Sequence, residues 1–364
     1  MHMMAEQASN RGDSSMQGAQ CALQGRVSLL ITAYRNAELV RRCIDSLIEV
    51  YGERLPEIIL VDDTPGDETV RSLAESYAKY GVKFAVMPKN GGFAGANNFG
   101  YPLCTGEFVV LVNSDIVFHE DSLSAMLEFM DAHPKAGIVQ GTLLIKNGQD
   151  GADGALNGCG SFLTPFGTTN AVGWFAPADD PVAKTARRCF AAYGAMFMIR
   201  RGVMESTGRL FYDFFHTYYE EVDFCHRAWL CGWEVWYVPT PPVDHAHGAT
   251  MSRFYTREDV LRKFYRNMRF SFSTCFGWRG RLTIRPLFEL GCLVQSILQL
   301  LRGKGVAWRA HRWARRELKA MKPQIAEARR RIQSSRVISD TELFKAVCRR
   351  YTLADLWRTI RGNI

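Results

Sequence analysis

The sequence lacks the cysteine spacing of a zinc or redox site. Ten cysteines are spread over 364 residues, with no CxxC pair and no zinc-ligand pattern. They are Cys21, Cys43, Cys104, Cys159, Cys189, Cys225, Cys231, Cys275, Cys292 and Cys348. In a chain of this length, scattered cysteines indicate reduced thiols in the core of a cytosolic protein.

Signals for secretion or for a membrane span are also lacking. Residues 1–25 are polar and have no apolar stretch of the kind that a secretory signal needs, so we expect a disordered leader. The most apolar segment, 287–301, has 15 residues, whereas a span needs about 20. We therefore expect an amphipathic helix there, either at a membrane interface or packed on the protein. Internal repeats and low-complexity tracts are absent from the sequence.

Positive charge is concentrated in one segment. The net charge of the chain is +8, yet residues 302–336 hold twelve Lys and Arg against two Glu, which is +10 and leaves −2 for the remainder. Such a basic tail fits nucleic acid, an anionic membrane or an acidic protein as partner. The neighbouring apolar segment, with Trp308 and Trp313 beyond it, favours the membrane surface.

Strand and helix patterns alternate along the first half of the chain. Short apolar runs predict strands at 26–33, 57–62, 82–87 and 107–112, and later at 190–200 and 233–239. Helices are expected at 36–50, 67–80, 219–231 and 255–275. This alternation predicts an α/β fold with a mostly parallel sheet between helices, whose ligands bind beyond the carboxyl ends of the strands.

Acidic residues follow two of these strands. Asp62 and Asp63 end the second, where carboxylates can accept hydrogen bonds from a nucleobase or a ribose; the alternative is capping of the next helix, for which Asp67 is better placed. Asp115 ends the fourth, after Asn113 and Ser114, and is the best candidate for a metal ligand; the alternative is a helix cap or a turn residue.

Residues 90–100, NGGFAGANNFG, form a Gly- and Asn-rich stretch after the third strand. Glycines allow a backbone to approach a phosphate closely, but the stretch is no clean GxGxxG and does not follow the first strand. A dinucleotide site is therefore weakly indicated, and a turn leading into a helix is the alternative.

Two further clusters carry ionisable groups. Glu220, Glu221 and Asp223 lie among aromatic residues, where a carboxylate with a raised pKa suits general-base catalysis; Asp223 can also pair with Arg227 four residues on. A solvated acidic face is the alternative. His245 begins an HxH pair, with His247, that follows a strand and can ligate a metal.

Together these segments resemble glycosyltransferase family 2, in the branch that includes bacterial rhamnosyltransferases. The resemblance runs from about Val27 to Phe272, and its order is specific although each motif alone is weak. The segments are VSLLITAYRN, IILVDDTPGDET, KNGGFAGANNFG, LVNSDIVF, FFHTYYEEVDFCHRAWLCGW and VDHAHGAT, with Tyr265-Arg266-Asn267 beyond.

The resemblance implies a GT-A fold and an inverting, metal-dependent mechanism with Mg²⁺ or Mn²⁺. Glu221 matches the catalytic base, Asp115 the metal-binding acid and His245 a histidine that closes on the metal or the diphosphate. The implied donor-binding residues are Thr32, Tyr34, Asp62, Asp63, Asn90, Gly92, Asn98, Gly100 and Asn113.

Two departures from the family pattern leave alternatives open. The base position is usually Asp in a Glu-Asp pair, but here it is Glu221 after Glu220, so Glu220 and Asp223 stay candidates. The usual Gly-x-Phe-Asp-Glu segment reads GRLFYD at 208–213, with its acid displaced to Asp213.

We thus expect three regions: a leader at 1–25, a GT-A domain at 26–272 and a helical, basic C-terminal region at 273–364. The expected reaction moves a sugar, with dTDP-rhamnose favoured over UDP-sugars, to a cell-surface glycan or a lipid-linked saccharide at the cytoplasmic face of the membrane. Nucleic acid is not expected as a partner.

Rival hypotheses are a non-catalytic glycan- or nucleic-acid-binding protein and a nucleotidylyltransferase. The latter needs a Gly-rich, Arg-containing loop after the first strand, where residues 32–36 read TAYRN.

Overall fold

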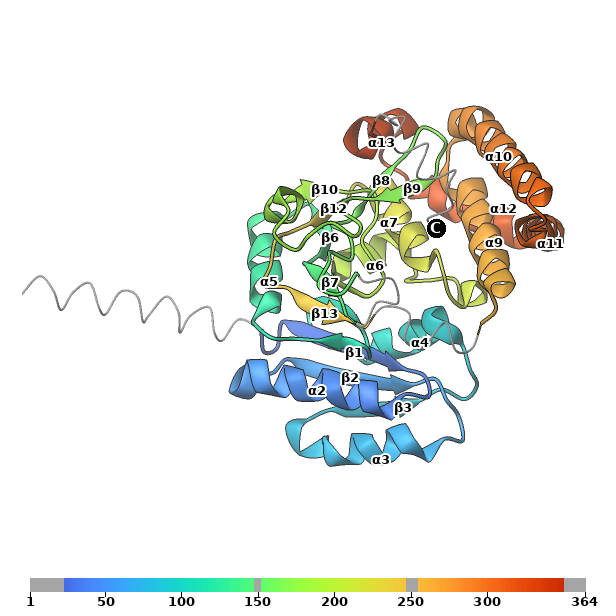
Figure 1. Ribbon diagram of the computed structural model, residues 1–364. Helices are drawn as coiled ribbons and strands as arrows, with labels where there is room; N and C mark the ends of the chain where they lie inside the picture. Colours follow the sequence, from blue (N-terminus) through green and yellow to red (C-terminus); the bar gives the residue numbers. More distant parts are fainter. Residues whose placement is uncertain (1–22, 147–151, 247–254, 350–364) are drawn as a thin grey trace, which may run out of the picture.

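The computed structural model describes residues 23–146, 152–246 and 255–349. An eight-stranded sheet lies between layers of helices, and further helices enclose one side of the molecule (Figure 1). The expected α/β architecture with a helical C-terminal region is confirmed.

Four parallel strands form one half of the sheet: β3 (Lys83–Val86), β2 (Glu57–Asp62), β1 (Val27–Ala33) and β4 (Phe108–Asn113), in that order. The runs of buried Val, Ile and Leu in β2, β1 and β4 are apolar on both faces because helices cover both sides. The covering helices in this half are α2 (Ala37–Tyr51), α3 (Glu68–Ser76) and α4 (Gly92–Gly100).

The other half of the sheet is mixed. Strand β11 (Met196–Arg200) runs antiparallel to β4 and to β6 (Ala136–Gln140), which is parallel to β12 (Glu234–Tyr237); β10 (Arg187–Arg188) forms the edge. Helices α5 (Ser122–Ala132), α6 (Arg201–Thr207) and α7 (Glu220–Leu230) pack here. Most of the long expected strands and helices are present, but 190–200 is a strand only from Met196.

Short strands that the sequence did not predict build two smaller sheets. Strand β13 (Val243–His245) lies between β5 (Ile116–Val117) and β7 (Leu143–Ile145), and β8 (Ser161–Leu163) pairs with β9 (Thr169–Ala171). The sheet β5-β13-β7 joins three segments that are far apart in the sequence and lie beside the end of β4.

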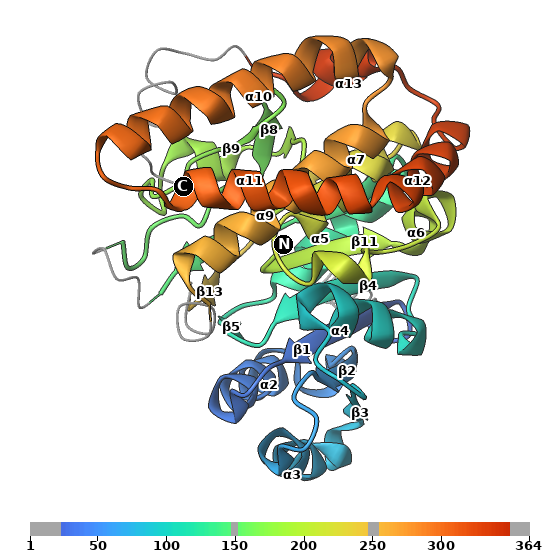
Figure 2. The same ribbon diagram turned by 90° about the vertical axis from the view of Figure 1, so that its right-hand side faces the viewer.

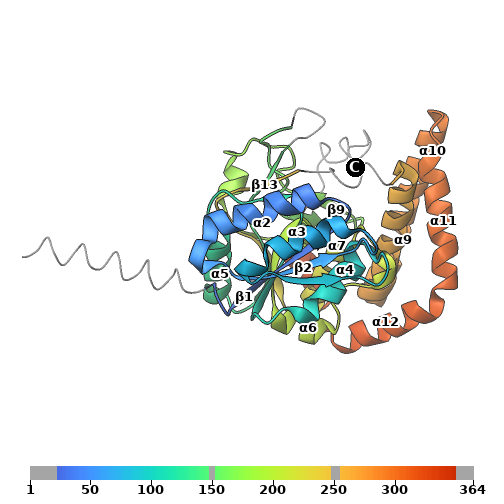
Figure 3. The same ribbon diagram turned by 90° about the horizontal axis from the view of Figure 1, so that it is seen from below.

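The C-terminal helices are α9 (Arg257–Cys275), α10 (Trp278–Leu301), α11 (Val306–Ala320), α12 (Lys322–Ser334) and α13 (Asp340–Val347). Figures 2 and 3 show α9 against the sheet side, with α10 and α11 forming the outer wall. Phe288, Ile332 and Leu343 share one core cluster with strand residues such as Val109. The region from 273 onward is therefore packed into the same core, and the boundary expected after residue 272 falls inside α9.

Two further expectations need correction. The expected leader, 1–25, extends too far, because Leu23 is fully buried; residues 1–22 lie outside the described part of the chain. The apolar segment is longer than 287–301, since α10 has 24 residues and, within the described part of the chain, is long and apolar enough to cross a membrane by length and composition. The length of α10 therefore does not exclude a membrane span, contrary to the expectation.

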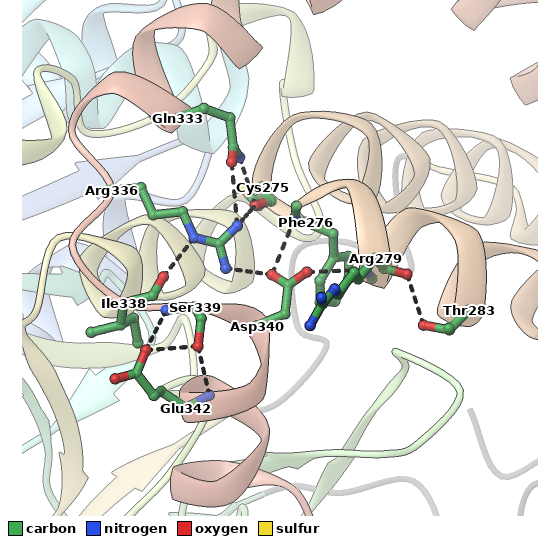
Figure 4. A network of polar contacts seen from close by, with 12 residues as sticks. Cys275, Phe276, Arg279, Thr283, Gln333, Arg336, Ile338, Ser339, Asp340 and Glu342 are labelled. Carbon is green, nitrogen blue, oxygen red and sulfur yellow. Dashed lines mark hydrogen bonds and ion pairs between the residues drawn. The ribbon is translucent and has the colours of Figure 1, made fainter.

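A polar junction joins the end of α9 and the start of α10 to the last helices (Figure 4). Asp340 accepts hydrogen bonds from the backbone N–H groups of Gly277 and Gly280, both at 3.1 Å, and Arg336 pairs with the same carboxylate. Because the first N–H groups of a helix have no partner within it, Asp340 supplies the cap that α10 lacks locally. Gln333 donates to the last carbonyls of α9 in the same way.

A buried ion pair fixes α7. Arg227 donates to Asp223 at 2.8 Å, and both side chains are only 1% exposed. The guanidinium also donates to the carbonyl oxygens of Arg209 and Leu210. The pairing expected from the four-residue spacing is confirmed, and it ties α7 to the segment that precedes it.

We expect Asp223→Asn to lower the free energy of unfolding by about 3 kcal/mol, because it leaves the buried Arg227 charge without its counter-ion. Urea denaturation followed by circular dichroism measures this. The control is Glu38→Gln, which removes an ion pair with Arg41 whose partners are 52% and 70% exposed and should change stability by less than about 1 kcal/mol. Equal effects of the two changes would contradict the structural role of Asp223.

Candidate active site

Polar residues meet at the carboxyl ends of three adjacent strands. Thr32 of β1 lies between Val61 of β2 and Asn113 of β4, and Asp62 ends β2. The order β4-β1-β2 therefore brings Thr32, Asn113 and the Asp62–Asp63 pair to one edge, as the alternating pattern predicted.

Asp63 holds the Gly-rich segment in place. Its Oδ1 accepts from the N–H of Gly91 at 2.6 Å, and its Oδ2 accepts from the N–H of Gly92 at 2.8 Å and from Nδ2 of Asn90 at 2.9 Å. Burial raises the pKa of Asp63 to about 6, although these backbone donors favour the ionised form. Both carboxylate oxygens thus have partners within the protein, and nucleobase binding by Asp63 stays a prediction.

Asp62 differs from its neighbour. One carboxylate oxygen accepts from the N–H of Thr64, while Oδ2 is buried without a hydrogen-bond partner among the described residues. Burial raises its pKa. Helix α3 is capped by Asp67, which accepts from the N–H of Thr69, so neither Asp62 nor Asp63 is used as the cap.

Most of the Gly- and Asn-rich stretch is helical, not a loop, because α4 begins at Gly92. Asn98 exchanges hydrogen bonds with the backbone of Phe211 and donates to Asp213. A side chain at Gly100 would collide with Leu30 and Val61. These two residues position α4 against its neighbours, and their expected contact with the donor stays a prediction.

Gly92 needs glycine for its backbone conformation as well as for space. Its φ is +66°, and a Cβ there would overlap the ring and carbonyl of His216. The close approach brings the start of α4 against the turn that precedes α7.

Asp115 and His245 come together through the small sheet. β13 pairs antiparallel with β5, and His245 Nε2 lies 3.4 Å from Asp115 Oδ1. Asp115 precedes β5 in a turn and caps no helix, since α5 is capped by Asp121. His247, the second member of the HxH pair, lies outside the described residues.

The donor set of this pair fits a divalent cation. Asn157 Oδ1 lies 2.6 Å from His245 Nδ1, and in the neutral tautomer that donates this bond the Nε2 lone pair is on the side of Asp115. Asp115 Oδ1 is buried without a hydrogen-bond partner in the described residues. A carboxylate and an imidazole suit Mn²⁺, and Mg²⁺ is usually held by one or two carboxylates with substrate phosphates. Within the described chain no third His, Cys, Asp or Glu completes the set.

A strained turn leads into α7. His216, Tyr218 and Tyr219 all have positive φ, between 61° and 73°, which is uncommon for residues other than glycine. Asn267, fully buried on α9, places its Nδ2 within 3.2 Å of the carbonyl oxygens of Phe215, Thr217 and Tyr218. Such strain persists where the surroundings over-determine it, and it is frequent at active sites.

This turn places Glu221 at the edge that holds Asp115. The carboxylate of Glu221 lies against Gly194, where an added Cβ would be 3.4–3.5 Å from its atoms. Residue 195 follows directly and accepts a hydrogen bond from the N–H of Asn113 at 2.9 Å. Burial raises the pKa of Glu221 to about 7, which suits a general base at neutral pH.

The two alternative bases have different surroundings. Glu220 is 6% exposed, and burial together with the charge of Glu221 raises its pKa well above the usual range. Asp223 is paired with Arg227 in the core. Of the three carboxylates, Glu221 alone is only half-buried, so it remains the best-placed candidate for the base.

Three residues near the donor segment were not selected from the sequence. His216 Nε2 lies 3.0 Å from Asn90 Oδ1, and its Nδ1 lies 3.5 Å from Lys263 Nζ, which sits 3.8 Å from the centre of the Tyr255 ring. Burial lowers the pKa of Lys263 to about 8 and that of His216 to about 4. Burial raises the pKa of Tyr255, and the charges of Tyr34 and Asp63 add to the shift, so this cluster is electrostatically linked to the residue that holds the donor segment.

A cavity of about 180 Å³ adjoins Asp115 and is also lined by Arg42, Lys146, Asp153 and Asp244. A larger one, of about 430 Å³, lies at the opposite edge of the sheet beside β10 and α13 and contains none of the candidate residues. The smaller cavity is the one that belongs to the site.

Comparisons with known proteins agree with this arrangement. The chain is 30% identical over 122 residues to the poly-beta-1,6-N-acetyl-D-glucosamine synthase of Staphylococcus epidermidis, which is 33% of this chain and 29% of that protein. It is 30% identical over 102 residues to the chondroitin synthase of Escherichia coli, covering 28% of this chain and 15% of that protein. The matches thus span less than a third of these relatives.

Solved structures share the fold at low identity. GalNAc-T7, solved with UDP, GalNAc and Mn²⁺, matches with a TM-score of 0.56 at 14% identity, over 81% of this chain and 57% of that one. The mannosyltransferase PcManGT of Pyrobaculum calidifontis, solved with GDP-Man and Mn²⁺, matches with a TM-score of 0.51 at 16% identity, over 93% and 84%. These likenesses establish a GT-A-like fold.

The family model of glycosyl transferase family 2 matches residues 28–208, from the first strand of the sheet to the end of α6. That range contains Asp62, Asp63, the donor segment and Asp115, which the fold brings to one edge. The chain therefore carries a glycosyl transferase family 2 domain with a GT-A fold.

Proposed function

We propose that the protein transfers a sugar from a nucleoside diphosphate to a hydroxyl of a glycan, with inversion at the anomeric carbon. The observation that carries the proposal is the position of Glu221, a half-buried carboxylate with a pKa of about 7, at the sheet edge that also holds the Asp115–His245 pair. A general base with a pKa near the working pH is the most effective.

In the proposed reaction, the Glu221 carboxylate takes the proton of the acceptor hydroxyl. The acceptor oxygen forms a bond to the anomeric carbon, while the bond from that carbon to the diphosphate oxygen breaks and the nucleoside diphosphate leaves with the electron pair. Asp115 and His245 would hold Mg²⁺ or Mn²⁺, which neutralises charge on the diphosphate. Asn157 orients the imidazole, and Asn267 orients the turn that carries Glu221.

Donor binding is assigned to the strand ends and the start of α4. Thr32, Tyr34, Asp62 and Asn113 are proposed to contact the nucleoside, and the Asn90–Gly92 segment held by Asp63 to face the diphosphate. Resemblance to rhamnosyltransferases favours dTDP-rhamnose, with UDP-sugars as the alternative.

The proposed acceptor is a growing cell-surface glycan or a lipid-linked saccharide, met at the cytoplasmic face of the membrane. The relatives with polysaccharide-synthase names support a glycan acceptor. The +10 charge of residues 302–336 supports a location at an anionic surface.

A donor panel tests the proposal directly. Purified protein is mixed with Mg²⁺ or Mn²⁺ and with dTDP-rhamnose, UDP-glucose, UDP-galactose, UDP-N-acetylglucosamine or GDP-mannose. We expect metal-dependent release of nucleoside diphosphate with one donor, and a thermal shift that reflects about 2.7 kcal/mol when the ligand is at 100 times its dissociation constant. No release and no shift with any donor would favour a binding protein instead.

Asp115→Asn tests the cation site. The change keeps the shape of the side chain and removes its charge, so we expect the metal-dependent part of the turnover to fall at least about tenfold, with the fold unchanged by circular dichroism. Asp153→Asn, which alters a residue lining the same cavity, is the matched control and should retain its metal response. If both variants respond to metal like the unmodified protein, Asp115 is not the ligand.

Glu221→Gln tests the base. Removing the proton acceptor should lower turnover by about 10²–10⁴-fold while donor binding persists. In the unmodified protein the rate should rise with pH up to about 7 and then level off, because the pKa of Glu221 is about 7 and the ionised form is the active one. Glu220→Gln is the control, expected to retain this profile; loss of the profile in that variant alone would make Glu220 the base.

A further inference from the structure

Helix α10 is attached to the protein by a narrow stripe. Its buried residues are spaced four apart: Gly280, Ile284, Phe288, Cys292 and Ser296. Residues at this spacing follow one line along a helix, so the rest of the circumference faces outward.

The outward face of α10 is apolar. From Pro286 to Leu301 every exposed residue is apolar or glycine, and the exposed side chains include Leu290, Leu293, Val294, Ile297, Leu298 and Leu301. At 100° per residue these six positions cover an arc of about 140° without a polar side chain. Helices at the surface of a soluble protein normally carry charged residues on their exposed side. Helix α10 instead exposes its apolar side over this stretch.

Near the middle of α10, Glu289 faces the protein and fixes the rotation of the helix. Glu289 accepts from Arg269 of α9 at 2.8 and 3.0 Å and from Arg315 of α11 at 2.6 Å. Arg269 is 4% exposed and also donates to His311, which stacks on Tyr265. Turning the apolar face inward would break this network and leave the charge of Arg269 unpaired.

Basic residues border the apolar face. The loop after α10 exposes Arg302 and Lys304, and α11, which runs beside α10 in Figure 2, exposes Arg312, Arg316 and Lys319. Trp278 and Trp308 are exposed as well. Apolar side chains flanked by Lys, Arg and Trp match the acyl-chain boundary and the phosphates of an anionic bilayer.

We propose that the exposed face of α10 is a docking surface for an anionic lipid bilayer and lies in the plane of the interface. The helix is about 36 Å long at 1.5 Å per residue, but its buried stripe and Glu289 keep one side on the protein, so lipid reaches only the other side. This docking surface does not depend on the transferase activity, whereas a lipid-linked acceptor rests on the proposed function.

Docking through α10 also orients the molecule. In Figures 1 and 2, α10 lies at the end opposite α3, which belongs to the half of the sheet that carries the donor segment. The nucleotide half would then face the aqueous phase that supplies the donor, and the acceptor would come from the bilayer.

Vesicle sedimentation of the full chain tests the docking surface. We expect the protein to sediment with phosphatidylcholine–phosphatidylglycerol vesicles, more weakly with phosphatidylcholine alone, and less as salt increases. Leu290→Gln with Val294→Gln should lower the partition coefficient about tenfold or more, because two apolar side chains leave the interface. The matched control is Tyr80→Gln with Leu103→Gln, which alters two exposed apolar residues of the α3 half and should bind like the unmodified protein.

Equal sedimentation of the two double variants would overturn the proposal. A second result would also overturn it: the unmodified protein does not sediment with vesicles but forms dimers, and Leu290→Gln with Val294→Gln dissociates them. A second copy of the chain would then cover the face. Nucleoside diphosphate release measured without vesicles separates this question from the transferase activity. Loss of sedimentation with unchanged release supports the docking surface, and sedimentation without any release would overturn the proposed function alone.

Discussion

One buried amide, that of Asn267, holds the turn on which the candidate active site depends. Its Nδ2 lies within hydrogen-bond distance of three carbonyl oxygens between Phe215 and Tyr218, in a turn where three residues have positive φ. Without these bonds the turn would lose the donor that links its carbonyls to α9, and less would offset a backbone conformation that costs of order 1–3 kcal/mol per residue. The position of Glu221 at the start of α7 follows from this turn.

The same helix, α9, also fixes the orientation of α10. Asn267 points to the turn before α7, while Arg269, two residues on, reaches Glu289 on α10 and His311 on α11. Two residues within one turn of α9 thus carry the polar contacts that order the candidate catalytic carboxylate and those that keep the apolar face of α10 outward. The helical C-terminal region is for this reason part of the catalytic fold and not an appendage.

Much of this arrangement can be predicted from local sequence patterns, and some of it cannot. Apolar runs predict β1, β2 and β4, and parallel pairing then forces Thr32, Asp63 and Asn113 to one edge. The small sheet β5-β13-β7 has strands of two or three residues, which are too short to show a hydrophobic period in the sequence. That this sheet brings Asp115 next to His245 could therefore be seen only in the structure. An amphipathic pattern in 287–301 likewise does not say which face is inside; the ion pair of Glu289 with the buried Arg269 decides that.

Asp63 and Glu221 show why a motif match transfers positions more safely than roles. Burial raises the pKa of both carboxyl groups, to about 6 and about 7. Yet Asp63 has N–H donors on both oxygens, which hold the backbone of Gly91 and Gly92, so a proton taken up there would weaken the donor segment. Glu221 lies at the N-terminus of α7, packs against Gly194 and is only half-buried. A raised pKa serves catalysis only where the carboxylate can reach a proton of the substrate, and this is the role that we propose for Glu221 and not for Asp63.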